Sequence, residues 1–348
     1  MILSAGIYGF SQSGKTTLFN IFTGSHIELI SFSKSENNVA VIDVPDKNLD
    51  WLNEVYQPDK KVNSKIKIID FNNNNLSNLY NVDIICIVLR NFTNENVLHH
   101  LNRINPQQDF NIIFSDFILD DLKKVENRIE KLTNKKGQKL TNIETIELNL
   151  LQKLKEHLEK EKPLYNFPFS QNELSQIRSY SFLTLKPIIC ILNSDDDFEQ
   201  KENFKFIKDF FESNNFSYFF IKAKLELEIS QLSKEEQAEY MKELGLDDTG
   251  RNKLIKEIYK KLNLINFYTV GKDEVRAWAI PKNSTALDAA AAIHSDIAKG
   301  FIKAEVVHFN DIKKYGSFEE CKKNNIVRLE PKNYIVKDGD CVHIRFNV

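Results

Sequence analysis

The chain has 348 residues, of which 42% are hydrophobic and 28% are charged. This length predicts two or three domains, and the composition is typical of a globular protein with ample apolar side chains for a core. No apolar run approaches the roughly 20 residues that cross a bilayer, which argues against a membrane-spanning helix. The net charge of −2 excludes a chain that is basic overall, so contact with nucleic acid would have to come from a local patch.

The start of the chain and its cysteines predict a cytoplasmic protein. The first residues, MILSAGIYGF, have no basic stretch before an apolar one and no small-residue cleavage site, so secretion is not expected. The four cysteines lie far apart and form no C-x-x-C pair: Cys86, Cys190, Cys321 and Cys341. We expect reduced thiols and no zinc site.

The first half of the chain predicts an α/β fold. Residues 2–8 form a short apolar strand, residues 9–14 favour a turn, and residues 15–23 carry apolar side chains at helical spacing. Later segments are typical of buried strands, and the last two are continuously apolar, as parallel strands covered on both faces are. These segments are KIKIID at 65–70, DIICIVLR at 83–90 and PIICILN at 187–193.

Between the last two strands, the sequence predicts an antiparallel helical hairpin. Two apolar stripes with helical spacing flank a polar turn at 134–140 that contains Gly137. The stripes are Leu122, Val125, Ile129 and Leu132, then Ile143, Ile146, Leu150, Leu151, Leu154 and Leu158. The Lys- and Glu-rich outer faces either contact a partner or are the solvated faces of a structural arm.

From about residue 264, the pattern predicts a separate β-grasp-like domain of ordinary size. Strands are expected at EVRAWAI (274–280) and AEVVHF (304–309), with a helix at 285–299 capped by Ser284. The segment YIVKDGDCVHIRF is expected to form a final hairpin around Asp338-Gly339. The connector to this domain begins near residues 247–250.

The strongest motif is GFSQSGKT at residues 9–16, which matches G-x-x-x-x-G-K-[ST] between a strand and a helix. In this motif, backbone N–H groups surround phosphate oxygens at a helix N-terminus, the lysine reaches the β- and γ-phosphates, and the Thr16 hydroxyl holds Mg²⁺. The alternative is a plain glycine-rich turn. The predicted nucleotide-binding residues are Gly9, Ser11, Gln12, Ser13, Gly14, Lys15, Thr16 and Thr17.

Polar residues after later strands complete the predicted site. Asp70 ends its strand and is expected to hold Mg²⁺ through water, although an aspartate at a strand end is also a common cap or turn residue. Asn193 and Asp196 have the spacing of the N-K-x-D element, in which the aspartate accepts hydrogen bonds from guanine. A polar turn after a strand is the alternative for Asn193 and Asp196.

With these motifs, the chain resembles the YchF/Obg-like ATPase family of the TRAFAC class of P-loop GTPases along nearly its whole length. The resemblance rests on AGIYGFSQSGKTTLFN, VIDVPDKNLDWL, DLKKVENRIEKL, KEEQAEYMKELGLDDTG, EVRAWAI, AAIHSDIAKGFIKAEV and YIVKDGDCVHIRFNV. It implies a G-domain-like, mainly parallel P-loop NTPase sheet with an inserted coiled-coil hairpin and a C-terminal ubiquitin-like TGS domain. The expected boundaries are 1–115 and 184–263 for the NTPase domain, 116–183 for the hairpin and 264–348 for TGS. The resemblance also implies a preference for ATP over GTP, association with ribosomes, and roles in translation and stress responses.

The chain departs from the family pattern around the nucleotide. Lys34 stands where the family has the switch I threonine that completes the Mg²⁺ shell, and a protonated lysine cannot ligate a metal. Asp70-Phe71-Asn72-Asn73 replaces D-x-x-G, and the glycine-rich switch II stretch that should follow is deleted. The family's Ser-Ala-Lys loop near the base corresponds to Lys222-Ala223-Lys224, so Ala223 and Lys224 are predicted to lie at the nucleotide. We therefore predict nucleotide binding with weak or absent hydrolysis.

Other questions stay open at this stage. Asp196 occupies the guanine-reading position while Ser194 replaces the usual lysine, so ATP and GTP both remain candidates. The protein is either an ATPase or GTPase that acts with the ribosome, or a nucleotide-bound scaffold acting through its arm and TGS domain; a small-molecule kinase is the weaker third reading. Basic residues of the last domain form either an RNA-facing patch or a scattered solvated surface. They are Lys282, Lys299, Lys303, Lys313, Lys314, Lys322, Lys323 and Arg328.

Overall fold

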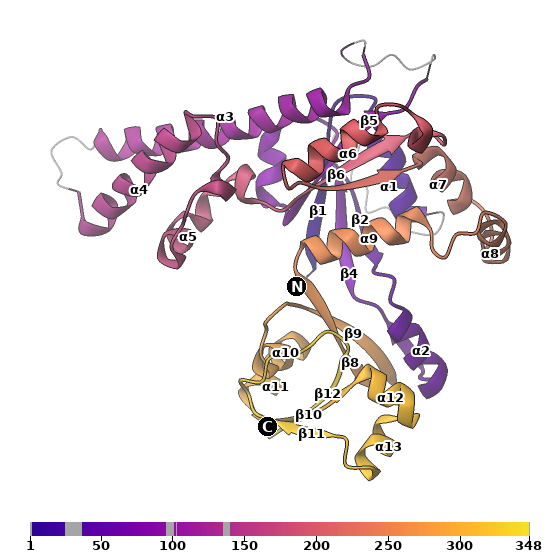
Figure 1. The fold of residues 1–348 in the computed structure, drawn as a ribbon. Helices are drawn as coiled ribbons and strands as arrows, with labels where there is room; N and C mark the ends of the chain where they lie inside the picture. The colour runs from indigo at the N-terminus through magenta and orange to yellow at the C-terminus, as the bar shows by residue number, and fades with distance from the viewer. Residues whose placement is uncertain (1, 25–36, 95–100, 102, 135–139, 348) are drawn as a thin grey trace. The chain divides into compact units, whose positions relative to one another are not determined.

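The computed structural model describes all residues except 1, 25–36, 95–100, 102, 135–139 and 348 (Figure 1). The chain separates into two units. The first unit contains Ser4–Ala40 and Ile68–Gln237, and the second contains Met1–Leu3, Val41–Lys67 and Ala238–Val348. Among the described helices, none combines the length and the apolarity that crossing a membrane requires.

A six-stranded sheet forms the centre of the P-loop fold. Its order is β2 (Asn38–Asp43), β4 (Lys65–Asp70), β1 (Leu3–Tyr8), β5 (Ile84–Asn91), β6 (Ile188–Ser194) and β7 (Ser217–Ile221). The pairs β1–β5, β5–β6 and β6–β7 are parallel, and every residue of β5 and β6 is buried. The continuous apolar runs of β5 and β6 therefore belong to strands covered on both faces, as their sequence predicts. The carboxyl ends of these parallel strands meet at one edge of the sheet.

Helices surround this sheet and extend from it. The α-helices of the first unit are α1 (Lys15–Thr23), α3 (Pro106–Thr133), α4 (Asn142–Leu158), α5 (Gln171–Ile177), α6 (Phe204–Ser213) and α7 (Ala223–Ser230), and α8 (Lys234–Glu243) follows at the boundary between the units. Short 3₁₀ helices lie at Leu76–Asn81, Leu164–Asn166, Arg178–Tyr180, Leu183–Leu185 and Phe198–Gln200.

The helical hairpin is present, and α3 and α4 run side by side (Figure 1). Most of the predicted stripe is buried, including Val125, Leu132 and Leu154. At the tip of the hairpin no described neighbour covers the predicted stripe, and Ile143 and Ile146 are 78% and 54% exposed. Apolar periodicity identifies the face of a helix but not the length over which a neighbour covers that face.

A buried carboxylate fixes the base of this arm. Asp121 of α3 accepts hydrogen bonds from the backbone N–H groups of Leu183 (2.7 Å) and Thr184 (2.9 Å) and from the Thr184 hydroxyl (2.7 Å). Burial outweighs these donors and raises the pKa of Asp121 to about 6. The returning chain is thus attached to α3 through one fully buried side chain.

Replacement of this carboxylate should destabilise the first unit. In Asp121→Asn, the amide nitrogen faces a donor and leaves one buried N–H or O–H without an acceptor, which costs about 1–3 kcal/mol. Urea unfolding at neutral pH should show a loss of this size. Glu156→Gln, at an exposed position on α4, serves as the control and should unfold like the wild type. Equal midpoints for the two variants would contradict a role for Asp121 in holding the arm.

The second unit contains a mixed sheet that draws on distant parts of the chain. Its order is β11 (Arg328–Glu330), β10 (Phe301–His308), β12 (Asp340–Phe346), β8 (Leu264–Val270), β9 (Glu274–Pro281) and β3 (Lys60–Val62). β12 pairs with β8 in parallel and with β10 in antiparallel orientation, and β3 joins the edge of the sheet parallel to β9. Its helices are α2 (Lys47–Tyr56), α9 (Gly250–Lys261), α10 (Ala286–Ile293), α11 (Ser295–Lys299), α12 (Phe309–Tyr315) and α13 (Phe318–Lys323).

Three local predictions for this unit were wrong. The cap of α10 is Thr285 and not Ser284, because Thr285 and Asp288 form a reciprocal capping box. The predicted helix 285–299 is also interrupted at His294, whose backbone is extended. The final hairpin is absent from the described chain, since Asp338 Oδ1 accepts from Asn266 N (2.8 Å) and β12 pairs with β10 and β8 instead.

Candidate nucleotide-binding site

The P-loop occupies the carboxyl edge of the first sheet, between β1 and α1. Three of its residues have positive φ: Gly9 at 152°, Gln12 at 65° and Gly14 at 98°. A Cβ atom on Gly9 would lie 2.4 Å from the carbonyl oxygen of Val88, and one on Gly14 would lie 2.3 Å from Asn193 Nδ2. Both glycines are therefore required by the close approach of neighbouring groups as well as by the turn.

The lysine and the inner serine of the loop are placed for an anion. Lys15 Nζ donates to the carbonyl oxygens of Gly9 (2.7 Å) and Phe10 (2.9 Å) within the loop itself. Burial lowers the pKa of Lys15, and the nearby Asp70 carboxylate offsets part of that shift. Ser13 is buried, and its hydroxyl has no hydrogen-bond partner among the described residues. A phosphate group entering the loop would supply acceptors to both side chains.

Asn193 connects the P-loop to two other elements. Its Nδ2 donates to the carbonyl oxygen of Ser13 (3.1 Å), and its Oδ1 accepts from Ala223 N (3.4 Å) at the start of α7. The side chain is buried at the end of β6. Both polar ends of Asn193 are thus used to hold the phosphate loop and the segment that contains Ala223 in fixed register.

Asp70 and Thr16 lie together at the other side of the loop. Thr16 Oγ1 donates to Asp70 Oδ2 (3.2 Å), and Asn38 Nδ2 lies 3.4 Å from the same oxygen. Asp70 is 3% exposed, and burial raises its pKa. A hydroxyl and a carboxylate at this separation fit a Mg²⁺ ion held directly by Thr16 and through water by Asp70. Asn38 was missed by the sequence analysis, although it opens the strand next to the one that Asp70 ends.

A cavity of about 900 Å³ continues from the P-loop. Gln12, Gly14 and Thr17 line it on the side of the loop. The predicted residues Asn193, Asp196, Ala223 and Lys224 line it as well, so the fold brings them together. Residues 92–94 and Leu227 also contribute and were missed; residues 92–94 could have been found because they follow β5 at the same edge of the sheet. Ser11 is exposed on the loop.

The two acidic residues after Ser194 have different surroundings. Asp195 is bound to Thr93 and Lys201, whereas Asp196 is exposed on the cavity wall. Asp196, which the sequence predicts to read guanine, is therefore accessible, while the Asp195 carboxylate is already engaged in protein contacts. Ser194, in the position of the usual lysine, has its hydroxyl engaged by Asn91 Nδ2 at 2.9 Å.

The segment that replaces D-x-x-G forms turns closed by its own side chains. Asn73 Oδ1 accepts from Asn75 N (3.1 Å) and from Asn78 Nδ2 (2.8 Å), and Asn75 Oδ1 accepts from Ser77 N (3.0 Å). These contacts lead directly into the 3₁₀ helix at Leu76–Asn81. Lys34 lies outside the described residues.

Full-length relatives align with the whole chain. The ribosome-binding ATPase YchF of Bacillus subtilis (strain 168) is 35% identical over 367 residues, and that of Escherichia coli O157:H7 is 35% identical over 364 residues. In both cases the alignment covers 100% of this chain and 100% of the relative. This chain belongs to the YchF family.

The YchF assignment extends to structure. The solved structure of the Schizosaccharomyces pombe YchF GTPase superposes with a TM-score of 0.86 at 27% identity, covering 99% of this chain and 97% of that one. Residues 264–347 also match the YchF-GTPase C-terminal family model, described as a protein of unknown function (DUF933). The YchF fold, a P-loop G-domain-like sheet with a helical insertion and a C-terminal domain, is therefore established for this chain.

Neutralising Asp70 should stabilise the nucleotide-free protein and impair its use of Mg²⁺. The folded-state pKa of Asp70 lies above the ordinary value of 3.8, so its ionised form costs stability, and this cost disappears as the pH falls through the folded-state pKa. Asp70→Asn keeps an oxygen for Thr16 and Asn38 but carries no charge. We expect its Tm to exceed that of the wild type at neutral pH, with the difference shrinking as the pH falls towards 3.8.

The matched control is Asp43→Asn, which changes an exposed carboxylate at the end of β2. Its Tm difference should not follow the same pH course. In the presence of ATP, Asp70→Asn should gain no stability from added Mg²⁺, whereas Asp43→Asn should gain as much as the wild type. A lower Tm for Asp70→Asn at neutral pH would contradict the burial cost assigned to this carboxylate.

Proposed function

We propose that the chain binds a purine nucleoside triphosphate with Mg²⁺, hydrolyses it slowly or not at all, and acts on the ribosome. The observation that carries this proposal is the geometry of the P-loop. Lys15 and the unpartnered hydroxyl of Ser13 lie within the described loop, and Asn193 binds the carbonyl oxygen of Ser13. The bacterial relatives are named ribosome-binding ATPases, which supports both the nucleotide and the partner.

In this proposal, the phosphates displace the carbonyl oxygens of Gly9 and Phe10 from Lys15. The buried ammonium exchanges two neutral acceptors for an anion, which strengthens its hydrogen bonds because charge-assisted bonds are stronger than neutral ones. Thr16 and Asp70 are the residues placed to hold Mg²⁺, which when bound neutralises charge on the β- and γ-phosphates. Binding would thereby offset the free-energy cost of burying the charges of Lys15 and Asp70.

Weak hydrolysis follows from what surrounds the γ-phosphate position. In related NTPases, the backbone N–H of the glycine in D-x-x-G contacts the γ-phosphate, and a switch segment positions the attacking water. Here Asn73 stands in that place and its side chain closes a turn. Residues 76–81 form a 3₁₀ helix, so the polar side chains of this segment bind one another and not the phosphate in this proposal.

The choice of base depends on Asp196 and on the apolar surface of the cavity. A carboxylate at this position accepts hydrogen bonds from N–H groups of a purine, and Phe92 and Leu227 offer surface to either ring. The names of relatives point both ways, since the bacterial proteins are called ATPases and the S. pombe structure is called a GTPase. We propose ATP as the main ligand with GTP as a competitor.

The alternative is a nucleotide-bound scaffold that acts through its arm and C-terminal domain. The exposed Ile143 and Ile146 at the tip of α4 favour a contact role for the arm. The basic residues of the C-terminal domain are less available than their number indicates, because Lys322 and Lys323 are paired with Glu305 and Glu320. Lys303, Lys313 and Lys314 are exposed and are the candidates for contact with ribosomal RNA.

Nucleotide titration combined with phosphate release tests binding and hydrolysis on one sample. Lys15→Ala should lower ATP affinity about 10- to 100-fold, the effect of losing a hydrogen bond to a charged group. Lys205→Ala, an exposed lysine on α6, is the control and should bind like the wild type. Phosphate release by the wild type should stay at or below the unaided GTPase range, on the order of 10⁻⁴ to 10⁻² per second.

Two results would count against this proposal. Unchanged affinity in Lys15→Ala would remove the P-loop from nucleotide binding. Turnover of about one per second or faster would place the chain among efficient NTPases despite its altered switch region. If nucleotide leaves the amount of protein that sediments with ribosomes unchanged, the scaffold alternative is favoured.

Base selectivity is tested by Asp196→Ala. Loss of the carboxylate should weaken GTP binding about tenfold, the range expected for hydrogen bonds to a charged acceptor, and should change ATP binding less. The measurement is the ratio of the two dissociation constants in wild type and variant. If neither constant changes, Asp196 does not contact the base.

A further inference from the structure

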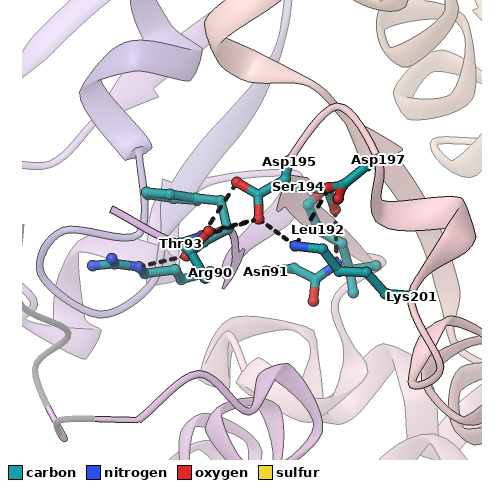
Figure 2. Close-up of polar contacts among 9 residues, drawn as sticks. Arg90, Asn91, Thr93, Leu192, Ser194, Asp195, Asp197 and Lys201 are labelled. Atoms are coloured by element: carbon teal, nitrogen blue, oxygen red, sulfur yellow. Dashed lines mark hydrogen bonds and ion pairs between the residues drawn. The ribbon is translucent and has the colours of Figure 1, made fainter. Parts of the chain in front are cut away.

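Asp195 joins the two loops that form the walls of the nucleotide cavity. Its carboxylate accepts from Thr93 N (3.1 Å) and from Thr93 Oγ1 (3.1 Å), in the segment after β5, and from Lys201 Nζ. Figure 2 shows these contacts converging on the one carboxylate. The Asp195 side chain thus binds residues 92–94, which follow β5, to the β6 loop, defined here as residues 195–201.

A second contact lies immediately beside this one. Asn91 at the end of β5 donates to Ser194 Oγ (2.9 Å), and Ser194 Oγ in turn donates to the carbonyl oxygen of Leu192 (3.1 Å). The strand ends are paired up to Asn91 and Ser194 by the parallel sheet. Beyond that point the backbone ladder stops, and Asp195 is the residue that continues the connection into the loops.

The β6 loop is also closed on itself. Lys201 pairs with Asp195 and lies 3.5 Å from Asp197. Phe198 is buried and stacks on Phe220 of β7, with ring centroids 4.8 Å apart. Asp196 therefore lies between Asp195, which is bound to Thr93, and the part of the β6 loop that Phe198 anchors in the core.

We propose that Asp195 is a positioning residue that sets the distance between the wall formed by residues 92–94 and the base-reading Asp196. This inference rests on the proposed nucleotide site. Residues on both walls line the cavity, so the contact that joins the walls determines its width at the base end. The phosphate end is held separately, by Asn193 and the P-loop, and does not depend on Asp195.

The bridge depends on the acceptor oxygens of Asp195. Thr93 and Lys201 together present an N–H, a hydroxyl and an ammonium group to its Oδ2 atom. An asparagine keeps one acceptor oxygen, which can still take these donors, so Asp195→Asn would not remove the bridge. Asp195→Ala removes both acceptor oxygens and is the variant that breaks the contact.

The test compares ligands that do and do not contain a base. In Asp195→Ala, ATP and GTP affinity should fall about tenfold, whereas the affinity for inorganic tripolyphosphate should stay within about twofold of the wild type. Lys201→Met should weaken nucleotide binding by less, up to about fivefold, because this ion pair is partly solvated. Lys201→Arg keeps the charge and should bind nucleotide like the wild type.

Glu199→Gln is the matched control, since Glu199 is exposed in the same loop and is not part of the described lining of the cavity. It should leave every affinity unchanged. Equal loss of ATP and tripolyphosphate affinity in Asp195→Ala, or no loss of ATP affinity, would overturn the proposal. If the wild type binds neither ligand, the proposed function itself fails, and this outcome is distinguishable from failure of Asp195 alone.

Discussion

The nucleotide site depends on the two hydrogen bonds of the Asn193 side chain. One polar end holds the carbonyl of Ser13 and the other holds the N–H of Ala223, so a single buried amide keeps the P-loop and the start of α7 together. Gly14 is required in part because this amide lies where a Cβ atom would be. The site is therefore built around a strand end, and the rigidity of β6 between two parallel neighbours is transmitted to the phosphate loop.

The P-loop and the segment after Asp70 have different physical requirements. Phosphate binding needs backbone N–H groups, a lysine and a hydroxyl, and these come from one continuous loop after a buried strand. γ-Phosphate sensing needs a separate segment that changes conformation, and here asparagine side chains close that segment into local turns. Burial shifts the pKa values of Lys15 and Asp70 in the directions that disfavour charge, so a bound anion and cation would stabilise the folded state.

The second unit shows that the C-terminal domain does not fold from C-terminal residues alone. Asp46 caps α2 through the N–H groups of Asn48 and Leu49, and the same carboxylate accepts from Asn266 Nδ2 (2.9 Å) and Tyr268 OH (2.8 Å). Leu49 and Leu52 of α2 pack in the core beside Tyr268, and β3 extends the sheet. The matched C-terminal family segment at 264–347 therefore omits strand β3 and helices α2 and α9, which belong to this unit.

The sequence by itself determined those parts of the protein whose structure depends on residues close together in the chain. The P-loop, the continuously apolar β5 and β6, and the hairpin stripe follow from spacing and local chemistry, and helix α1 spans the residues expected for it. The final hairpin and the tip of the stripe were mispredicted because their outcome depends on contacts from distant residues. The Ser284 cap was wrong for a local reason, since Thr285 and Asp288 form the capping box instead. Only the tertiary structure could reveal Asn38 beside Asp70, Asp195 between two loops, and β3 in the C-terminal sheet. In each case the decisive partner is far away in sequence, and a local pattern carries no record of which strand ends the fold brings together.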